Sequence, residues 1–375
     1  MKPYGIILLA SERSGSNLLR TLLGNHSNIS APIAPHLITI FYPIKHYYLN
    51  LTRKDSRKNL FQDMLQIVNH PFSDWRLKLN YNEIESLEIN SVVKMMDYLY
   101  KKEAERNQKK HYCSKGINTF RFIDQMRKEV PTMKFIHLVR DPRDVVASWL
   151  KQKNSLNSSY DAILQWKKQQ KLLNNSKRNS GFHCITIKYE DLISDTSIIM
   201  DKIMFDLGLP IDHKCYETNS LNKESKKSKY WKNLSKPIMA NNINKFKDEL
   251  CQEDILMIET IAEEEMREYG YSPLSSQDWK INRKHINFIN EQRKIRKWEA
   301  KKNMSDSNQL LMSRQKLIRE TIAERRKKYL SSESFIGSVR NFMKFNIYKV
   351  IKRYILQFLG RFRITFIIRN YIHRN

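Results

Sequence analysis

Two stretches of the sequence combine anion-binding side chains with small residues that let an anion come close. The first is SERSGSNLLRTLL, in which Arg13, Ser14, Gly15, Ser16 and Asn17 separate an apolar run from a segment with helical spacing. In a strand-to-helix turn, several backbone N–H groups point at one spot and the helix dipole adds positive potential there. We therefore interpret the loop as a phosphate cradle. The alternative is a structural turn with a capping serine.

The second stretch is LVRDPRDVVAS, which ends an apolar run with Arg140 and carries Ser148 eight residues later. Arg140 is expected at the carboxyl end of a parallel strand, where open α/β sheets bind ligands. A helix that follows would bring Ser148 back along the same side, so the pair predicts a second anion site. The alternative is a surface ion-pair cluster of Arg140, Asp141, Arg143 and Asp144, worth about 0–1 kcal/mol. That alternative does not explain why the cluster ends an apolar strand.

Both stretches require a sheet to position them. The runs YGIILLA (4–10) and KFIHLV (134–139) are predicted to be buried parallel strands, and CITIKYEDL (184–192) a third strand that leads into a helix over 196–207. Residues 36–110 lack strand patterns and are expected to be helical. The succession of strand, loop and helix is typical of the α/β class, with a central parallel sheet flanked by helices.

Basic residues are concentrated at the C-terminal end of the chain. The protein has 375 residues and a formal charge of +28, and residues 280–375 hold 25 Lys and Arg against 6 Asp and Glu. We predict a domain over 1–275, with a helical insertion at 36–110 that binds the acceptor, and a basic, helical extension over 276–375. A charge of this kind favours polyanions or an anionic membrane without choosing between them.

Within the extension, residues 335–359 form an apolar stripe flanked by basic residues, which predicts an amphipathic helix. This helix either lies on an anionic membrane surface or packs on the body or a partner chain. Nucleic-acid binding is disfavoured because the extension lacks a recognised motif. There is no signal-peptide pattern and no run of 18 apolar residues, and the four cysteines are scattered. These features predict a cytoplasmic location, peripheral on the inner face of the membrane if the helix binds lipid.

Together, the two stretches resemble the nucleotide-binding signatures of sulfotransferases that use 3′-phosphoadenosine 5′-phosphosulfate (PAPS). SERSGSNLLRTLL resembles their 5′-phosphosulfate loop, commonly P-R-S-G-[TS]-[TS]-L-L, and FIHLVRDPRDVVASWL resembles their 3′-phosphate motif. The resemblance covers about residues 4–271 and is nearest to bacterial enzymes and the carbohydrate or tyrosylprotein branch. It implies a P-loop-type three-layer fold, PAPS as the donor and no metal. The loop lacks the lysine and second glycine of a kinase-type P-loop.

The resemblance also implies roles for individual residues. Loop residues 13–17 would take the 5′ end with its sulfate, and Arg140 with Ser148 would hold the 3′-phosphate. YEDL (189–192) would place Tyr189 near the nucleotide, and WKNLSKPI (231–238) would place Lys236 over it. SKGIN (114–118) would place Lys115 near the transferred sulfuryl group. With Arg13, Lys115 would neutralise charge on the bridging oxygen.

The general base is the point where the sequence departs from the family. Several branches carry a glutamate about twenty residues after the loop, and this chain has Ala34 there, in SAPIAPHLI. We nominate His36, because a histidine can accept a proton near neutral pH. The alternatives are that His36 only orients the loop, or that Glu12 is the base.

The leading hypothesis is a PAPS-dependent sulfotransferase that acts on a hydroxyl of a glycan or glycolipid. The alternative is a non-catalytic PAP-binding, anion-binding or membrane-associated protein with a degenerate site, which Ala34 favours. The intact Arg140 and Ser148 pair argues against that alternative. Neither the identity of the acceptor nor the oligomeric state can be read from the sequence.

Overall fold

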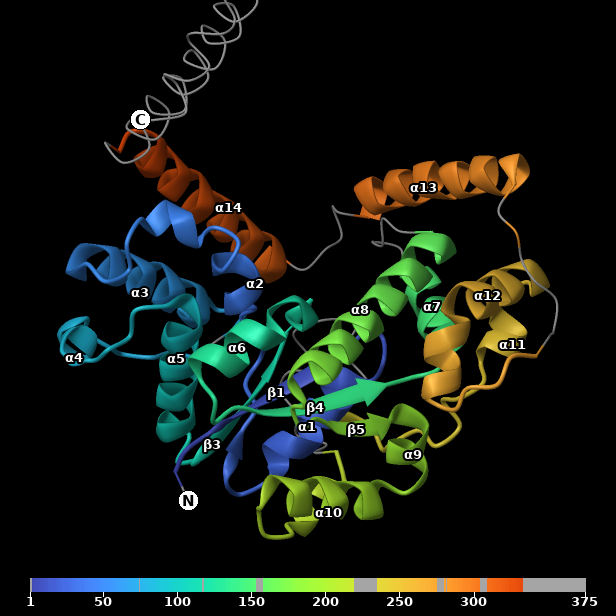
Figure 1. Cartoon of the computed structure of the whole chain (residues 1–375), viewed down its shortest axis with the longest axis horizontal. Helices are drawn as coiled ribbons and strands as arrows, with labels where there is room; N and C mark the ends of the chain where they lie inside the picture. Colours follow the sequence, from blue (N-terminus) through green and yellow to red (C-terminus); the bar gives the residue numbers. More distant parts are fainter. Residues whose placement is uncertain are drawn as a thin grey trace, which may run out of the picture.

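A central sheet of five parallel strands organises the molecule (Figure 1). The computed structural model describes residues 2–73, 75–116, 118–152, 158–218, 235–274, 280, 282–303 and 309–332. The strands run in the order β2-β3-β1-β4-β5, and every pairing is parallel. Their bounds are β1 (Gly5–Ala10), β2 (Ile29–Ser30), β3 (His111–Lys115), β4 (Lys134–Val139) and β5 (Ile185–Lys188). The predicted α/β fold with a central parallel sheet is confirmed.

Strand β1 lies in the middle of the sheet, and its residues alternate between two apolar layers because strand side chains point to opposite faces. Ile6 and Leu8 pack in one buried cluster, and Ile7 and Leu9 pack in the other. The first cluster includes side chains of α1 (Ser16–Asn25), α9 (Tyr189–Ser194) and α10 (Thr196–Leu207). The second includes α2 (Leu37–Phe41), α3 (Lys54–Asn69), α5 (Val92–Arg106) and α6 (Ile123–Glu129). The result is three layers.

A third buried cluster lies beyond the end of β4 and joins α7 (Pro142–Leu150), α8 (Ser159–Ser180), α11 (Phe246–Glu249) and α12 (Gln252–Glu268). Local capping explains where two of these helices begin. Asp141 accepts a hydrogen bond from the Arg143 backbone N–H and Pro142 occupies the first turn of α7, as the sequence predicts. At the start of α8, Ser158 and Asp161 form a reciprocal capping box.

The segment 36–110 is helical, as expected, and contributes mainly packing. Besides α2, α3 and α5 it contains η1 (Lys45–Tyr48) and α4 (Asn82–Glu85). Its aromatic side chains are largely interior: the rings of Trp75 and Tyr100 lie 4.6 Å apart, and those of Tyr100 and Tyr112 stack at 4.8 Å. Tyr48 and Tyr81 are also buried. Most of these aromatics therefore build the core.

Two strands and several boundaries differ from the prediction. The strand expected to be the third is the fifth, because β2 and β3 were not predicted. β3 has the sequence HYCSK, whose polar residues do not follow the pattern of a buried strand. It is nevertheless buried, because it lies between β1 and β2 in the sheet. Residues 189–192, expected to end a strand, already belong to α9. Two short helices, η2 (Thr119–Phe122) and η3 (His213–Tyr216), complete the assignment of the described residues.

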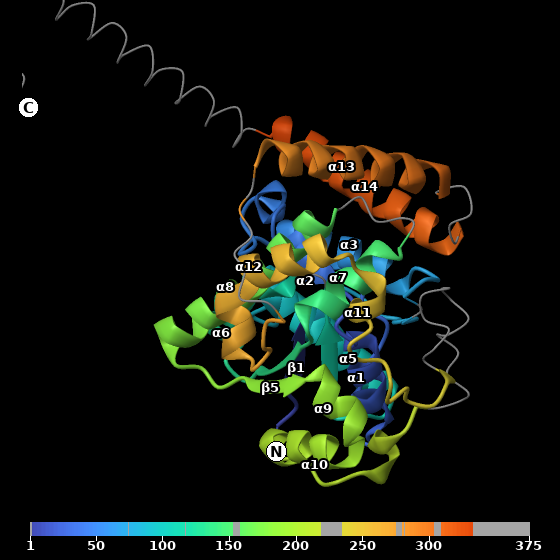
Figure 2. The ribbon, with the colours of Figure 1, turned by 90° about the vertical axis from the view of Figure 1, so that its right-hand side faces the viewer.

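The described part of the basic extension packs on the body as two helices, α13 (Arg283–Asn303) and α14 (Gln309–Leu330). Both lie on one side of the molecule, α14 beside α3 and α13 over α7 and α8 (Figures 1 and 2). Arg325 of α14 forms a buried ion pair with Asp63 of α3, at 2.5 and 2.8 Å. Arg293 of α13 pairs with Asp161 at the start of α8, at 2.6 Å. The amphipathic helix predicted over 335–359 lies outside the described residues.

Candidate active site

The loop between β1 and α1 has an unusual backbone. Arg13 and Gly15 adopt positive φ angles of 70° and 84°, and the Ser14 N–H donates to the Ser11 carbonyl at 3.2 Å. Gly15 is the N-cap of α1, and no side chain caps that helix. The first N–H groups of an uncapped helix are donors available to an anion. A Cβ on Gly15 would lie 2.3 Å from a ring carbon of Tyr189, so this ring packs directly on the loop backbone.

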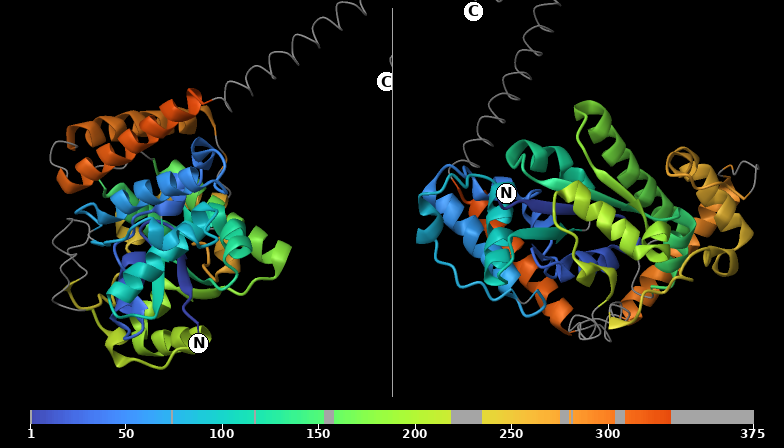
Figure 3. Two further views of the ribbon diagram at one scale, coloured as in Figure 1. Left: turned by 90° about the vertical axis from the view of Figure 1, so that its left-hand side faces the viewer. Right: turned by 90° about the horizontal axis from the view of Figure 1, so that it is seen from below.

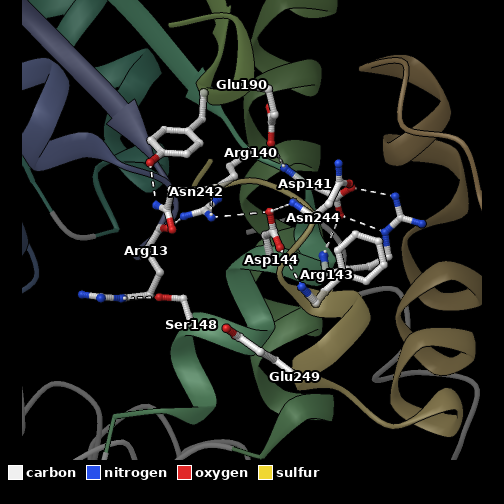
Figure 4. A network of polar contacts seen from close by, with 12 residues as sticks. Arg13, Arg140, Asp141, Arg143, Asp144, Ser148, Glu190, Asn242, Asn244 and Glu249 are labelled. Carbon is white, nitrogen blue, oxygen red and sulfur yellow. Dashed lines mark hydrogen bonds and ion pairs between the residues drawn. The ribbon is translucent and has the colours of Figure 1, made fainter. Parts of the chain in front are cut away.

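Arg140, at the carboxyl end of β4, connects this loop to the rest of the site (Figure 4). Its side chain is 5% exposed, and its guanidinium lies 4.3 Å from the centre of the Tyr189 ring. It donates to the Arg13 carbonyl at 3.3 Å and to the Asn242 carbonyl at 2.8 Å. The Asn242 amide in turn donates to the Tyr189 hydroxyl at 2.7 Å. Arg140 and Tyr189 are therefore held together against the loop.

Arg13 lies closer to the predicted 3′-phosphate end than the sequence suggests. Its Nε donates to the Oγ of Ser148, which lies on α7, at 3.2 Å (Figure 4). The resemblance assigns Arg13 to the sulfate and Ser148 to the 3′-phosphate, yet these two side chains are in contact. In this arrangement the Arg13 side chain spans from the loop to the helix that carries Ser148.

The charged residues that follow Arg140 are buried, so the surface ion-pair interpretation is wrong. Arg143 pairs with Asp141 and with Glu259, each at 2.6 Å, and all three side chains are less than a tenth exposed. Asp144 accepts the Asn244 backbone N–H at 2.9 Å. These contacts fix α7 against α12 and the 242–246 segment. They explain why the cluster follows an apolar strand. Arg140 is the arginine of the cluster that faces the loop.

Lys115 ends β3 on the other side of the loop. Its Nζ donates to Asn17 Oδ1 at 3.3 Å. Burial and, to a smaller extent, the charges of Arg20 and Arg13 lower the pKa of Lys115 to about 8, against the opposing charge of Glu12. Burial also raises the pKa of Glu12. The positive charges of Lys115 and Arg13 oppose burial and lower the pKa of Glu12.

His36 stands at the start of α2 with a left-handed backbone, φ 57°. Burial lowers the pKa of His36 to about 3, and the positive charges of Lys115 and Arg314 act in the same direction. The imidazole is therefore neutral near pH 7 and in the form that accepts a proton. Ala34, which takes the place of the expected glutamate, is buried and apolar.

Two other residues have roles outside the site. Glu190 has a structural role, because it accepts hydrogen bonds from the Asp141 backbone N–H at 3.1 Å and the Tyr271 hydroxyl at 2.8 Å. Lys236 is exposed, and its carbonyl accepts a hydrogen bond from Thr218 at 2.5 Å. No contact in the described residues brings the Lys236 side chain to the loop or to Arg140, so its predicted place over the nucleotide stays a prediction.

The site has donors that lack partners, which is what a phosphate or sulfate ligand would require. Arg140 Nε and Ser14 Oγ are buried without a hydrogen-bond partner in the described structure. Leaving buried donors unpaired is costly, and anionic oxygens would satisfy them. The residues present therefore fit the predicted donor. In the described ranges there is no cluster of three His, Cys, Asp or Glu side chains that could hold a metal ion, and no helix is long and apolar enough to span a membrane.

Sequence reasoning missed three residues of the site. Asn242 comes from an irregular segment and carries no motif that could have identified it. Arg20 lies one turn after Ser16 on α1 and donates to the Ala31 carbonyl at 2.5 Å. It could have been predicted, because an arginine on the buried face of that helix is unusual. Arg314 comes from the extension, which was expected to be separate from the site.

Comparison with known proteins identifies the family. Residues 3–213, more than half of the chain, match the model of the sulfotransferase family. The chain is similar in structure to the sulfotransferase domain from the curacin biosynthetic pathway, with 17% identity, a TM-score of 0.49, and coverage of 72% of this chain and 99% of that one. It is also similar to the sulfotransferase domain of the Synechococcus PCC 7002 olefin synthase, with 20% identity, a TM-score of 0.48, and coverage of 70% and 94%.

A sulfotransferase from Mycobacterium avium is 14% identical with a TM-score of 0.42, over 72% of this chain and 78% of that one. No curated protein matches the chain at a significant level. The family match includes the loop, Lys115, Arg140, Ser148 and Tyr189, and it ends before the basic extension. On the strength of this match, the chain belongs to the sulfotransferase family.

Proposed function

We propose that the protein transfers the sulfuryl group of PAPS to a hydroxyl group of a glycan or glycolipid. The observation that carries the proposal is the convergence of the loop, Arg140, Ser148 and Tyr189. Three segments that are far apart in sequence, the loop, residues 140–148 and Tyr189, meet through the Arg13 to Ser148, Arg140 to Arg13 and Arg140 to Tyr189 contacts. This is the arrangement that two-point binding of a nucleotide with phosphates at both ends requires.

The donor would supply an activated sulfuryl group, whose S–O bond to the 5′-phosphate breaks as a new S–O bond to the acceptor forms. Arg140 and Ser148 would hold the 3′-phosphate, with Arg13 between them and the loop. The N–H groups at the start of α1 and the Lys115 ammonium would bind the 5′ end and stabilise the charge that develops on the leaving oxygen. His36 would take the proton from the acceptor hydroxyl.

The neutral state of His36 suits this role but its low basicity does not. With a pKa of about 3, the imidazole accepts a proton poorly at pH 7. Two of the causes of this low pKa are neighbouring cations, and an anionic donor would offset them. We therefore expect the basicity of His36 to rise when the donor is bound, so that proton acceptance depends on donor binding.

A glycan or glycolipid acceptor is proposed from the resemblance to the carbohydrate branch and from the surface next to His36. Tyr42, at the end of α2, is partly exposed and has Lys45 Nζ 4.3 Å above its ring. A partly exposed ring beside a cation can bind the face of a sugar and an acidic substituent. The buried tyrosines of the same segment are excluded from this role.

The binding site and the chemistry are tested separately. Retention on immobilised 3′-phosphoadenosine 5′-phosphate (PAP) is compared between wild type and Arg140→Ala. We expect a roughly 10- to 100-fold loss of affinity, the effect of losing a charge-assisted contact. Transfer of labelled sulfate from PAPS to a panel of hydroxyl acceptors is then measured for wild type and His36→Asn. Asparagine tolerates the left-handed backbone, so this substitution removes the base without straining the loop.

Four outcomes are distinct. Loss of transfer in His36→Asn with unchanged PAP retention supports the assigned base. Full activity in that variant would exclude it and direct attention to Glu12. PAP retention without transfer to any acceptor by wild type would favour the non-catalytic alternative. No PAP retention by wild type would overturn the donor assignment altogether.

We further propose that the protein is cytoplasmic and that the extension attaches it to an anionic membrane surface. The specific observation is on α13, where Phe288, Ile295 and Trp298 are 53%, 56% and 64% exposed. Spacings of seven and three put them on one side of the helix, and exposed lysines at 284, 294 and 297 lie near them. A basic helix with exposed apolar side chains is typical of interfacial helices.

Sedimentation of the full chain with vesicles tests this attachment. We expect binding to phosphatidylcholine vesicles that contain phosphatidylglycerol and little binding to phosphatidylcholine alone. The double substitution Phe288→Ser/Ile295→Ser should weaken binding about tenfold or more. The matched control is Ile198→Ser/Phe205→Ser, which removes an equally spaced and even more exposed pair of apolar residues from α10. Equal effects in both variants, or retention on RNA without retention on vesicles, would count against the membrane proposal.

A further inference from the structure

Arg314 is a buried guanidinium that the basic extension contributes next to the candidate base. It lies on α14, about a hundred residues beyond the end of the family match. Its side chain is 4% exposed, and it donates to the Pro35 carbonyl at 2.5 Å, directly before His36 in the chain. Its guanidinium also lies 5.6 Å from the ring centre of Phe72. An arginine from the extension is therefore part of the wall of the site.

No carboxylate balances the charge of Arg314 among the described contacts. Its Nε is buried without a hydrogen-bond partner, and burial lowers its pKa. An uncompensated buried charge is strongly unfavourable, so a protein retains one where it has a task. Arg325, another buried arginine of the same helix, differs from Arg314 because a carboxylate balances its charge. Its Nε and Nη2 both donate to the Asp63 carboxylate.

Buried contacts hold helix α14 against the body, so the position of the Arg314 side chain is fixed. The Arg325 to Asp63 pair is joined by the Tyr48 hydroxyl, which donates to Asp63 at 2.7 Å. Thr321, between the two arginines on the helix, is buried as well. Arg314, Thr321 and Arg325 follow one another at spacings of seven and four, so one face of α14 is turned to the body. The figures show α14 lying along α2 and α3 (Figures 1 and 3).

We propose that Arg314 is a positioning residue for His36. Its guanidinium fixes the Pro35–His36 segment through the Pro35 carbonyl, and its charge, like that of Lys115, adds to burial in disfavouring the protonated imidazole until an anion enters the site. This inference rests on the proposed function, in which His36 takes the proton of the acceptor hydroxyl. It assigns the extension a direct part in the chemistry of the site.

The charged groups that act on His36 come from two elements. Lys115 approaches from β3 and Arg314 from α14, and both lower the pKa of His36 in addition to burial. Removing one of the two charges should raise the pKa of His36, because the protonated imidazole is then repelled less. When the effective dielectric constant is about 20, loss of a unit charge within about 12 Å corresponds to a pKa shift of roughly one pH unit or more.

The experiment compares Arg314→Gln and Arg314→Lys with wild type in the full-length protein. Arg319→Gln is the matched control, since Arg319 is an exposed arginine of the same helix. Histidine resonances are followed by NMR from neutral pH down to the onset of acid unfolding, with His36→Asn used to assign the His36 signal. PAP affinity, kcat and KM for the acceptor, and the unfolding midpoint are measured on the same samples.

We expect the His36 signal to titrate at higher pH in Arg314→Gln, by roughly one unit, and to stay close to wild type in Arg314→Lys and Arg319→Gln. The kcat of Arg314→Gln should fall about tenfold or more, with PAP affinity changed less than about twofold. An unchanged His36 titration in a folded Arg314→Gln that still binds PAP would overturn the inference while leaving the proposed function intact. Failure of wild type to bind PAP would instead defeat the proposed function.

Discussion

At the scale of residues, the site is defined by cations that are held apart by neutral groups. Arg13, Lys115, Arg140 and Arg314 reach it from four different elements. Arg140 donates to two carbonyls and forms a buried ion pair with Asp144 at 3.4 Å, and Arg314 donates to one carbonyl. The Nε of each guanidinium has no hydrogen-bond partner in the described structure, so each keeps a donor for a ligand. Glu12, the carboxylate that acts on Lys115, has a raised pKa. Such a site has a strong preference for multiply charged anions.

Lys115 should give donor binding a pH dependence. Its pKa is lowered to about 8, so the ammonium is charged below that pH and loses its charge as the pH rises through it. PAP affinity, measured by calorimetry, should therefore fall about tenfold between neutral pH and strongly alkaline pH. The phosphates are fully ionised in this range and contribute no change of their own.

Lys115→Arg is the control for this prediction, since a guanidinium keeps its charge throughout the range. It should flatten the alkaline decrease in affinity. If wild type and Lys115→Arg lose affinity in parallel, the decrease comes from another group and Lys115 does not contact the donor.

Much of this residue-level arrangement could be predicted from the sequence, because motif residues at strand ends meet at one edge of a parallel sheet. Arg140, Ser148, Tyr189 and the loop meet as expected. The contact of Arg13 with Ser148 could not be predicted, because side-chain direction depends on the positive φ at Arg13. Asn242 and Arg314 could not be predicted either, since their places depend on how distant segments pack.

At the scale of elements, the turn between β1 and α1 is the most constrained part of the fold. Gly15 needs its glycine for two independent reasons, a φ of 84° and the closeness of the Tyr189 ring. The ring in turn supports Arg140 through stacking and Asn242 through its hydroxyl. A change in this turn is therefore transmitted to the 3′-phosphate end of the site.

Gly15→Ala should destabilise the protein and abolish PAP binding. An alanine with a left-handed backbone costs about 1–2 kcal/mol, and overpacking against a ring adds roughly 1–3 kcal/mol. The control is Gly181→Ala at the end of α8, where φ is 56° but no atom lies within 4 Å of the added Cβ. Denaturant unfolding should show a larger loss for Gly15→Ala than for Gly181→Ala, and comparable losses with intact PAP binding would contradict the role of the Tyr189 contact.

Elements with a strong local signal were predictable, and elements that depend on tertiary burial were not. β4 has the predicted bounds, and α7 begins at Pro142 after the predicted cap. β3 was missed because its polar sequence becomes a strand only when β1 and β2 flank it. The early start of α9 was missed because the alternation of apolar and polar residues in ITIK (185–188) continues through Tyr189 and Glu190, so it does not show where the strand turns into a helix.

At the scale of the whole molecule, the extension and the family domain are joined at several places. α13 contacts the end of α7 through a hydrogen bond from Arg296 to the Leu150 carbonyl, at 2.5 Å. α14 contacts α3 and the segment before α2 through Arg325 and Arg314. The two helices therefore reach both the Ser148 end and the His36 end of the site. The sequence predicted the extension and its helices, and its division at residue 275 as a separate domain stays a prediction.

The buried pair of Arg325 and Asp63 tests how closely the two parts are coupled. Arg325→Ala leaves a buried carboxylate without its partner, which costs about 3–5 kcal/mol. If the extension unfolds with the body, denaturant unfolding should remain a single transition whose midpoint falls markedly. The control is Arg326→Ala, the exposed neighbour on the same helix. Two separate transitions, with the body unaffected by Arg325→Ala, would show that the extension is an independent unit.

The long separation of these contacts has a consequence for synthesis of the protein. The Arg314 to Pro35 contact spans 279 residues and the Arg325 to Asp63 pair spans 262. At roughly 5–20 residues per second, a ribosome needs about 15 to 55 seconds to make the chain between Pro35 and Arg314. During that time the nucleotide-binding edge can fold before Arg314 and Arg325 have been made, so the contacts of Pro35 and Asp63 with these arginines have not yet formed. The nascent protein would therefore bind its donor before it gains a fixed His36, and catalytic competence would come only near the end of translation.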